Sequence, residues 1–169
     1  MEPAPKTAGF AVNNSENSIQ LKRVISDDRE ALFHWRNHPS VRQHSIHTDE
    51  ISWDAHCQWF EQTLQNPQRV LLLGQNENGP VGVLRYDLHE DHSALISVYL
   101  VPERMGQGWG ALLLKAGNQW LKGEYPAVSP VLAEIFPDNP ASIRAFEKAG
   151  YQKALLQPQS GILTYEYIL

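Results

Sequence analysis

The stretch VPERMGQGWGALLL, residues 101–114, constrains the chain most, because it places three glycines within five residues and then continues into leucines. This pattern predicts a turn between a strand and a helix that spans about residues 108–122. Backbone amides without neighbouring side chains can approach a phosphate closely, and the first turn of a helix adds unpaired N–H groups and a partial positive charge. The stretch therefore predicts either a phosphate-binding turn or a tight turn with close helix packing.

Two common phosphate-binding motifs do not fit this stretch. A P-loop requires Lys and then Ser or Thr after its last glycine, whereas Gly110 is followed by Ala111 and Leu112. A dinucleotide-binding turn opens a parallel βαβ unit, whereas two predicted helices and several predicted strands precede this turn. The turn therefore belongs to another kind of fold.

The remaining patterns predict a mixed α/β sheet with helices packed on it. Capped stretches with helical spacing predict helices at 26–39, 52–67, about 108–122 and 139–150. Alternating or apolar runs predict strands at 19–25, 69–75, 81–88, 93–101, 130–136, 151–157 and 162–169. Residues 41–51 have no clear period and are predicted to form a loop.

Composition limits the domain organisation and the function classes. The 169 residues are 42% hydrophobic, which predicts one domain over 19–169 after a flexible polar tail over 1–18. A net charge of −5 argues against a broad surface for nucleic acid or anionic membranes. A single cysteine, no signal-peptide pattern and no apolar run near the roughly 20 residues of a membrane span together predict a cytoplasmic protein.

Two stretches resemble the GNAT superfamily of acyl-CoA N-acetyltransferases. YLVPERMGQGWGALLL (99–114) is similar to the family's acetyl-CoA loop, Arg/Gln-x-x-Gly-x-Gly/Ala. AEIFPDNPASIRAFEKAGY (133–151) is similar to a later segment, Asn-x-x-Ser followed by an aromatic-Glu-Lys-x-Gly ending. The resemblance implies the GNAT fold, which is a mixed, mostly antiparallel sheet of six or seven strands with helices on both faces. In this fold the fourth and fifth strands splay apart and make room for acetyl-CoA.

The resemblance also implies which residues bind acetyl-CoA. Backbone groups of Val98, Tyr99 and Leu100 would bind the pantetheine arm like an added strand. The turn that would hold the pyrophosphate consists of Met105, Gly106, Gln107, Gly108, Trp109 and Gly110. The remaining contacts, near pantetheine or the nucleotide, would be Asn139, Ser142 and either Arg144 or Lys148.

Two residues depart from the family pattern. Met105 stands at the Arg/Gln position of the loop, and the neighbouring Arg104 is expected to point elsewhere. One charge-assisted contact to phosphate is therefore missing, at a cost of about 1.5–3 kcal/mol. Phe146 stands where many members have a tyrosine that protonates the leaving thiolate, and a thiol with a pKa near ~8.5 can leave without that help.

Acetyl transfer needs a neutral amine and a group that removes its proton. Glu134 is the predicted base, because its carboxylate projects from the sheet face opposite to Ala133 and Ile135. A plain surface carboxylate at the end of a strand is the alternative. Ser97 and Tyr99 share one face of the preceding strand and are predicted to hold a water, although a tyrosine there also suits simple packing.

The segment HWRNHPSVRQHSIHTDEISWDAHCQWF, residues 34–60, is rich in His, Trp and Arg. Arginine forks bind phosphates bidentately, and tryptophan faces stack on sugars and nucleobases. The segment resembles the entry segment of acetyltransferases that act on nucleotide-linked amino sugars and, less closely, that of ribosomal-protein N-terminal acetyltransferases. Trp53 and Trp59 are predicted to lie in the core, and the alternative for the histidines is a solvated face. The predicted acceptor-binding residues are Arg36, Arg42, His47 and His56.

The sequence therefore predicts an acyltransferase that moves an acetyl group from acetyl-CoA directly to a primary amine. The favoured acceptor is a nucleotide-linked amino sugar, and a protein N-terminal α-amine and a catalytically weak CoA-binding module are the alternatives. No metal is expected, because the histidine spacings lack partner ligands, and Cys57 is not expected to act as a nucleophile beside His56. No nucleic-acid or membrane partner is expected, and the family resemblance leaves a homodimer open.

Overall fold

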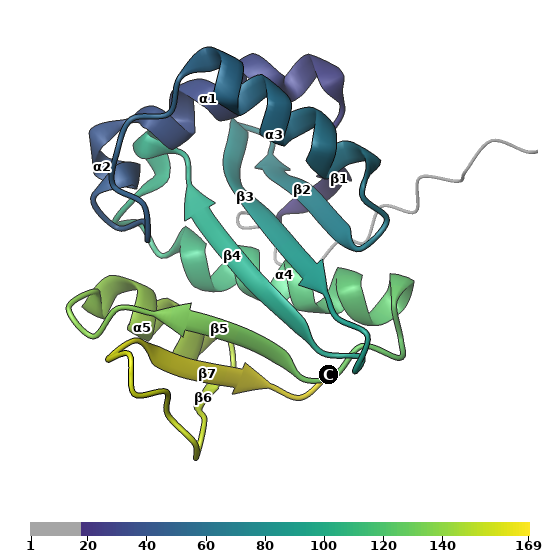
Figure 1. Ribbon diagram of the computed structural model, residues 1–169, viewed down its shortest axis with the longest axis vertical. Coiled ribbons are helices and arrows are strands. Elements are labelled where there is room, and N and C mark those ends of the chain that lie inside the picture. Colours follow the sequence, from purple (N-terminus) through teal and green to yellow (C-terminus); the bar gives the residue numbers. More distant parts are fainter. Residues whose placement is uncertain (1–17) are drawn as a thin grey trace, which may run out of the picture.

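Seven strands form one mixed sheet in the computed structural model, which describes residues 18–169 (Figure 1). Their bounds are β1 (Gln20–Arg23), β2 (Arg69–Asn76), β3 (Gly79–Leu88), β4 (Ala94–Leu100), β5 (Val131–Ile135), β6 (Gln152–Lys153) and β7 (Leu163–Tyr167). The strand order is β1-β2-β3-β4-β5-β7-β6, and every neighbouring pair is antiparallel except β4 and β5. Residues 1–17 of the predicted tail over 1–18 lie outside the described residues. The single domain over 19–169 stays a prediction.

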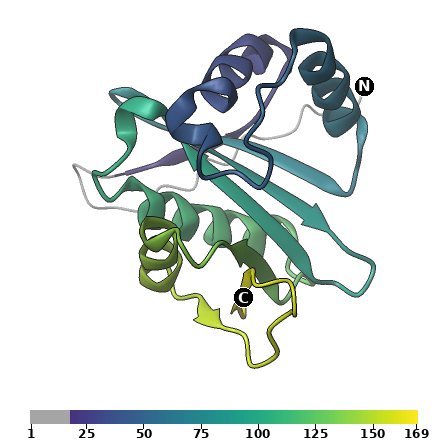
Figure 2. The same ribbon diagram turned by 60° about the vertical axis from the view of Figure 1, so that its left-hand side comes forward.

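Helices cover both faces of the sheet, as Figures 1 and 2 show, and this arrangement was predicted. The helices are η1 (Ser26–Asp28), α1 (Arg29–Asn37), α2 (Pro39–Arg42), α3 (Trp53–Gln65), η2 (Pro102–Arg104), α4 (Trp109–Glu124) and α5 (Pro140–Lys148). The layer of α1 and α3 lies on one face, and α4 and α5 lie on the other. No helix within residues 18–169 has the length and apolar character that a membrane crossing requires.

Alternation along β3 divides the apolar side chains between two cores. Leu84 and Tyr86 are fully buried in the larger core with α4 and α5, whereas Val83 belongs to the smaller core with α1 and α3. Because successive side chains point to opposite faces of a strand, Arg85 lies on the same face as Val83. The face beneath α1 and α3 therefore carries charged as well as apolar groups.

The parallel pairing of β4 and β5 is short. It joins Ala94, Leu95 and Ile96 to Val131, Leu132 and Ala133, and no further pair forms between these two described strands. The rest of β4 continues beside β3, and the rest of β5 continues beside β7, so the two halves of the sheet diverge (Figure 1). We call this gap, between residues 97–100 and residues 134–135, the splay. It confirms the predicted separation of the fourth and fifth strands.

The first predicted helix ends before Pro39 as expected, since α1 stops at Asn37. Two other local predictions were wrong. A loop was expected over 41–51, but a second helix, α2, begins at Pro39 and includes residues 41 and 42, because the first helical position needs no backbone N–H and His38 caps the helix by accepting from the Ser40 amide at 3.3 Å. The strand expected over 151–157 is reduced to β6, and the chain after it makes turns that end at β7.

Helix α4 approaches β3 so closely that Gly117 has no room for a side chain. A Cβ atom there would lie 2.5 Å from Leu84 Cδ1 and 2.5 Å from the Tyr86 hydroxyl. Both neighbours are fully buried, and Tyr86 also donates to Asn118 Oδ1 at 3.3 Å. The contact is therefore rigid, and it fixes the height of α4 above the strands that border the splay.

We predict that Gly117→Val lowers the free energy of unfolding by about 1–3 kcal/mol, because the added methyl groups displace buried neighbours. Gly123→Val is the matched control, since Gly123 is an exposed residue of the same helix. It should change stability by no more than about 0.5 kcal/mol. Urea denaturation measures both values, and equal values for the two variants would contradict the close contact.

Candidate active site

The glycines of residues 106–110 have two different roles. Gly106 and Gly108 have φ values of +73° and +84°, and no atom of residues 18–169 lies within 4 Å of a Cβ built on either. Gly110 lies inside α4, where a Cβ would meet the Ala145 Cβ of α5 at 3.2 Å. The first two glycines thus leave open space at the helix start, and the third permits close helix packing. The close-packing interpretation therefore applies to Gly110, and phosphate binding at Gly106 and Gly108 stays a prediction with which the open space agrees.

The start of α4 presents backbone amides to this open space. Gly108 is the N-cap residue, and no side chain of the described residues accepts a hydrogen bond there. The first amides of a helix have no partner inside the helix, and the helix dipole adds partial positive charge. The turn therefore has the donors and the room that a pyrophosphate group requires.

Arg104 points away from this space, as expected. Its guanidinium donates to Asn76 Oδ1 at 3.2 Å and to the carbonyls of Pro80 at 3.2 Å and Asn78 at 2.9 Å. It also lies 5.6 Å from the centre of the Trp109 ring. Arg104 thus fixes the turn between β2 and β3 to the start of α4 and does not replace the missing polar group.

The other side chains of the turn add little charge to it. Gln107 donates to the Glu103 carbonyl at 2.9 Å and accepts from the Trp109 indole at 3.4 Å. Trp109 is buried in the larger core, and Met105 is half-buried. The polar groups that the turn offers a ligand are therefore backbone groups.

Backbone groups of β4 also face the splay. The Ala94 amide donates toward β5, to the Pro130 carbonyl, whereas the Val101 amide donates toward β3, to the Val81 carbonyl. Because the direction alternates along a strand, Val98 and Leu100 direct their N–H and C=O groups into the splay. The backbone groups of Tyr99 point toward Val83 of β3. Of the three residues predicted to bind the pantetheine arm like an added strand, Val98 and Leu100 thus have backbone groups directed into the splay, and Tyr99 does not.

Arg85, Ser97 and Glu134 form a row across one face of three strands. Arg85 pairs in register with Ser97 and donates to its hydroxyl at 3.3 Å. Ser97 and Glu134 each follow the last β4–β5 pair, so they flank the beginning of the splay. Both residues are exposed on the face that α1 and α3 cover. For Glu134 this follows from Ala133 and Ile135, whose side chains point into the larger core on the opposite face.

Tyr99 lies on the same face, next to the row. It packs against the smaller core, and burial raises the pKa of its hydroxyl well above the ordinary range. The hydroxyl therefore stays protonated at neutral pH. Arg36 is close enough to oppose this shift electrostatically, which places Tyr99 beside the arginines of α1 and α2.

Arg36 of α1 and Arg42 of α2 are partly buried. Arg36 donates to the His47 carbonyl at 3.1 Å, and its second terminal nitrogen, Nη1, is buried without a partner among residues 18–169. Arg42 Nε is buried in the same way. Burial lowers the pKa of Arg36, and repulsion from Arg42 and Arg85 lowers it further. His47 contributes its backbone carbonyl, and its residue is exposed.

His56 lies between α1 and α3. It is 3% exposed, and its Nε2 lies 2.8 Å from the Arg29 carbonyl. Burial lowers its pKa, because the charged imidazolium loses water there. Trp59 packs against the smaller core as predicted, whereas the core prediction for Trp53 is wrong, since this residue is 43% exposed at the edge of the same aromatic group. The rings that surround His56 are Phe33, Trp53, Trp59 and Phe60.

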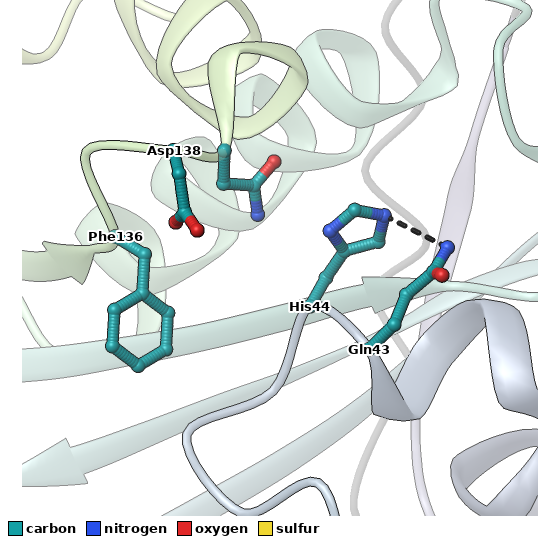
Figure 3. A pocket seen from close by; sticks show the side chains of 5 residues that line it. Gln43, His44, Phe136 and Asp138 are labelled. Atoms are coloured by element: carbon teal, nitrogen blue, oxygen red, sulfur yellow. Dashed lines mark hydrogen bonds between the residues drawn. The ribbon is translucent and has the colours of Figure 1, made fainter.

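A pocket of about 200 Å³ connects α2 to the loop between β5 and α5 (Figure 3). Figure 3 shows His44 and Asp138 on its opposite sides. Asn139 also lines it and caps α5, accepting from the Ser142 amide at 3.2 Å. Sequence reasoning missed the pocket because its two walls lie far apart in the chain. The lining residues are Gln43, His44, Phe136, Asp138 and Asn139.

The other predicted residues of α5 differ in exposure. Lys148 and Arg144 are exposed. Phe146 is 4% exposed and stacks edge-on against Tyr151, with the ring centres 4.9 Å apart. Phe146, which stands at the family's tyrosine position, is thus a core residue. Within residues 18–169, three or more potential His, Cys, Asp or Glu ligands do not gather at any one place.

A sheet that opens beside a glycine turn at a helix start is the arrangement expected of an acyl-CoA-dependent acyltransferase. A family model described as an acetyltransferase (GNAT) domain matches residues 18–152, and the chain belongs to this family. The match confirms the predicted fold class and enzyme class, with acetyl-CoA as the acyl donor.

Known proteins with related sequences or folds were also found. Acetyltransferase PseH of Campylobacter jejuni subsp. jejuni serotype O:23/36 (strain 81-176) is 24% identical over 135 residues, which cover 77% of this chain and 82% of the relative. Spermidine N-acetyltransferase from Vibrio cholerae, in complex with CoA and spermine, has a TM-score of 0.80 at 11% identity and covers 92% of this chain and 96% of its own. Aminoglycoside acetyltransferase AAC(6')-Ib, in complex with coenzyme A and kanamycin, has a TM-score of 0.75 at 19% identity, with coverages of 88% and 93%.

We predict that Gly108→Val lowers the affinity for acetyl-CoA at least about tenfold, because a branched side chain fills the space beside the helix amides. Isothermal titration calorimetry measures the affinity. Gly161→Val is the control for backbone strain, since Gly161 also has a positive φ, +79°, and open surroundings within the described residues. An unchanged affinity for Gly108→Val, or an equal loss for Gly161→Val, would contradict a phosphate contact at this turn.

Proposed function

We propose that this enzyme transfers an acetyl group from acetyl-CoA directly to the primary amine of a nucleotide-linked amino sugar. The observation that carries the proposal is the splay, because three kinds of groups border it. These are the free backbone edge of β4, the glycine turn at the start of α4, and the row of Arg85, Ser97 and Glu134.

Acetyl-CoA fits one side of the splay. Val98 and Leu100 would hold the pantetheine arm through backbone hydrogen bonds, and the amides after Gly106 and Gly108 would hold the pyrophosphate. Asn139 and Ser142 would lie along the arm, and exposed Lys148 offers a positive charge to the nucleotide end. Because Met105 supplies no charge and Arg104 is engaged elsewhere, the backbone provides most of the phosphate binding.

Glu134 is the group best placed to remove the proton from the amine. Its carboxylate is exposed on the acceptor face, beside the beginning of the splay. A water held by Ser97 would carry the proton from the attacking amine to this carboxylate. The amine nitrogen bonds to the thioester carbonyl carbon, and the thiolate leaves and takes a proton from water. Neutral Tyr99 would help to shape the site, whereas buried Phe146 takes no part.

Two features favour an acceptor linked to a nucleotide. Residues 34–60, which contain Arg36 and Arg42, resemble the entry segment of acetyltransferases that act on nucleotide-linked amino sugars. Both arginines also have buried nitrogens that have no partner in residues 18–169. His56 is omitted from the proposed acceptor contacts because it is buried between helices, and His47 contributes through its backbone. Cytoplasmic location and a possible homodimer stay predictions.

We predict that Glu134→Gln lowers turnover at pH 7 at least about tenfold and leaves the affinity for acetyl-CoA within about twofold, because the amide cannot accept the proton. Steady-state kinetics and calorimetry measure the two quantities. Glu166→Gln is the matched control. Glu166 lies opposite Leu132 on the same sheet face as Glu134, but it is beside the paired part of β4 and β5 and not beside the splay. Normal turnover of Glu134→Gln would remove this residue as the base.

Thiol release from acetyl-CoA tests the acceptor directly. We expect release with nucleotide-linked amino sugars and none above background with peptides that have a free N-terminus. Release with peptides alone would replace the sugar by a protein α-amine. Binding of acetyl-CoA without release on either panel would favour the CoA-binding module, for which the missing polar group at Met105 and the missing tyrosine at Phe146 are the motivating features.

A further inference from the structure

Three arginines from three different elements lie on the side of the sheet that α1 covers. Arg36 comes from α1, Arg42 from α2 and Arg85 from β3. Arg85 donates to Ser97 at the beginning of the splay, and Arg42, Arg85 and Tyr99 all lie near enough to Arg36 to act on its charge. Such a cluster of like charges, partly removed from water, is unfavourable unless an anion joins it.

The protein itself neutralises little of this charge. Arg85 forms an ion pair with Asp87 at 3.0 Å, but the same carboxylate also contacts Arg69 at 3.2 Å. Neither Arg36 nor Arg42 forms a salt bridge within the described part of the chain. In addition, Arg36 Nη1 and Arg42 Nε are buried without a hydrogen-bond partner there. These two donors lack a partner, and a small shift of either side chain is needed before a ligand can reach them.

Opposite charge lies at the other end of the row. Arg85 and Glu134 are two strands apart on the same face, with Ser97 between them. At the usual strand spacing this separation is about 10 Å, and the splay widens it. The splay is therefore positive on the side of β3 and negative on the side of β5, where Asp138 adds a second carboxylate near the pocket.

We propose that Arg36, Arg42 and Arg85 form an anion subsite that binds the phosphate groups of the acceptor while its amine faces Glu134. This inference rests on the proposed function and deepens it, since it adds Arg85 as a specificity-determining residue. An acceptor that carries only positive charges is disfavoured, because its second ammonium group would meet the arginines. Spermine and kanamycin, which are bound in the two solved relatives, are ligands of that kind.

The experiment compares one amino sugar in three forms: linked to a nucleoside diphosphate, as its 1-phosphate, and as its neutral methyl glycoside. For the native enzyme we expect kcat/KM to be lowest with the glycoside. Arg36→Gln, Arg42→Gln and Arg85→Gln should each lower kcat/KM for the two phosphorylated forms by roughly 10- to 100-fold more than they lower kcat/KM for the glycoside. Arg69→Gln is the matched control. Like Arg85, Arg69 forms an ion pair with Asp87, but it comes from β2, which lies farther from the splay.

Equal losses on all three forms, or no loss with the phosphorylated ones, would overturn the subsite. A loss with the nucleotide-linked form alone would also overturn it, because the contact would then be to the nucleoside. If no amino sugar is acetylated, the proposed function fails, and calorimetry with uridine diphosphate in the presence of saturating CoA still tests the subsite. Binding that weakens in the three variants but not in Arg69→Gln would support it, and no binding to the native enzyme would refute it.

Discussion

The contact on which the rest of the structure depends is the three-residue parallel pairing of β4 with β5. It is long enough to join two antiparallel halves into one sheet and short enough to let them diverge. Each strand keeps its other neighbour, β3 or β7, so the divergence leaves one edge of each strand open without loosening either half. Open edges of this kind are normally covered or paired in proteins. Here they are the part of the sheet that can accept a ligand.

The splay separates two chemical tasks between the two layers of the molecule. On the side of α4, the open groups are backbone amides, which suit a ligand that stays the same from one acceptor to the next. On the side of α1 and α2, the groups are charged side chains, which a change of residue can retune for another acceptor. The likeness to proteins with 11% and 19% identity shows a common fold alone, and it says nothing of these charged side chains.

Buried aromatic packing explains why several conspicuous residues stay outside the site. His56 is enclosed by rings and bonded to a backbone carbonyl, so it stabilises the contact of α1 with α3. Phe146 packs on Tyr151, whose hydroxyl donates to buried Asn118 at 2.8 Å. His56 was predicted to contact the acceptor, and Phe146 stands at the family's tyrosine position, but burial assigns both residues to packing. By contrast, Arg36 and Arg42 are buried with donors that packing leaves unused.

The sequence by itself determined most of the elements and the glycine turn before α4. Glycines at 106 and 108 permit positive φ, apolar alternation marks the strands, and the opposition of Glu134 to Ala133 and Ile135 follows from strand geometry. These are local properties, which a few neighbouring residues decide. Only the tertiary structure decided that Arg85 joins Arg36 and Arg42, that Asp138 meets His44 across a pocket, and that Trp53 is exposed. Those contacts join segments far apart in the chain, and their physical cause is how helices and strands pack, which no local pattern encodes.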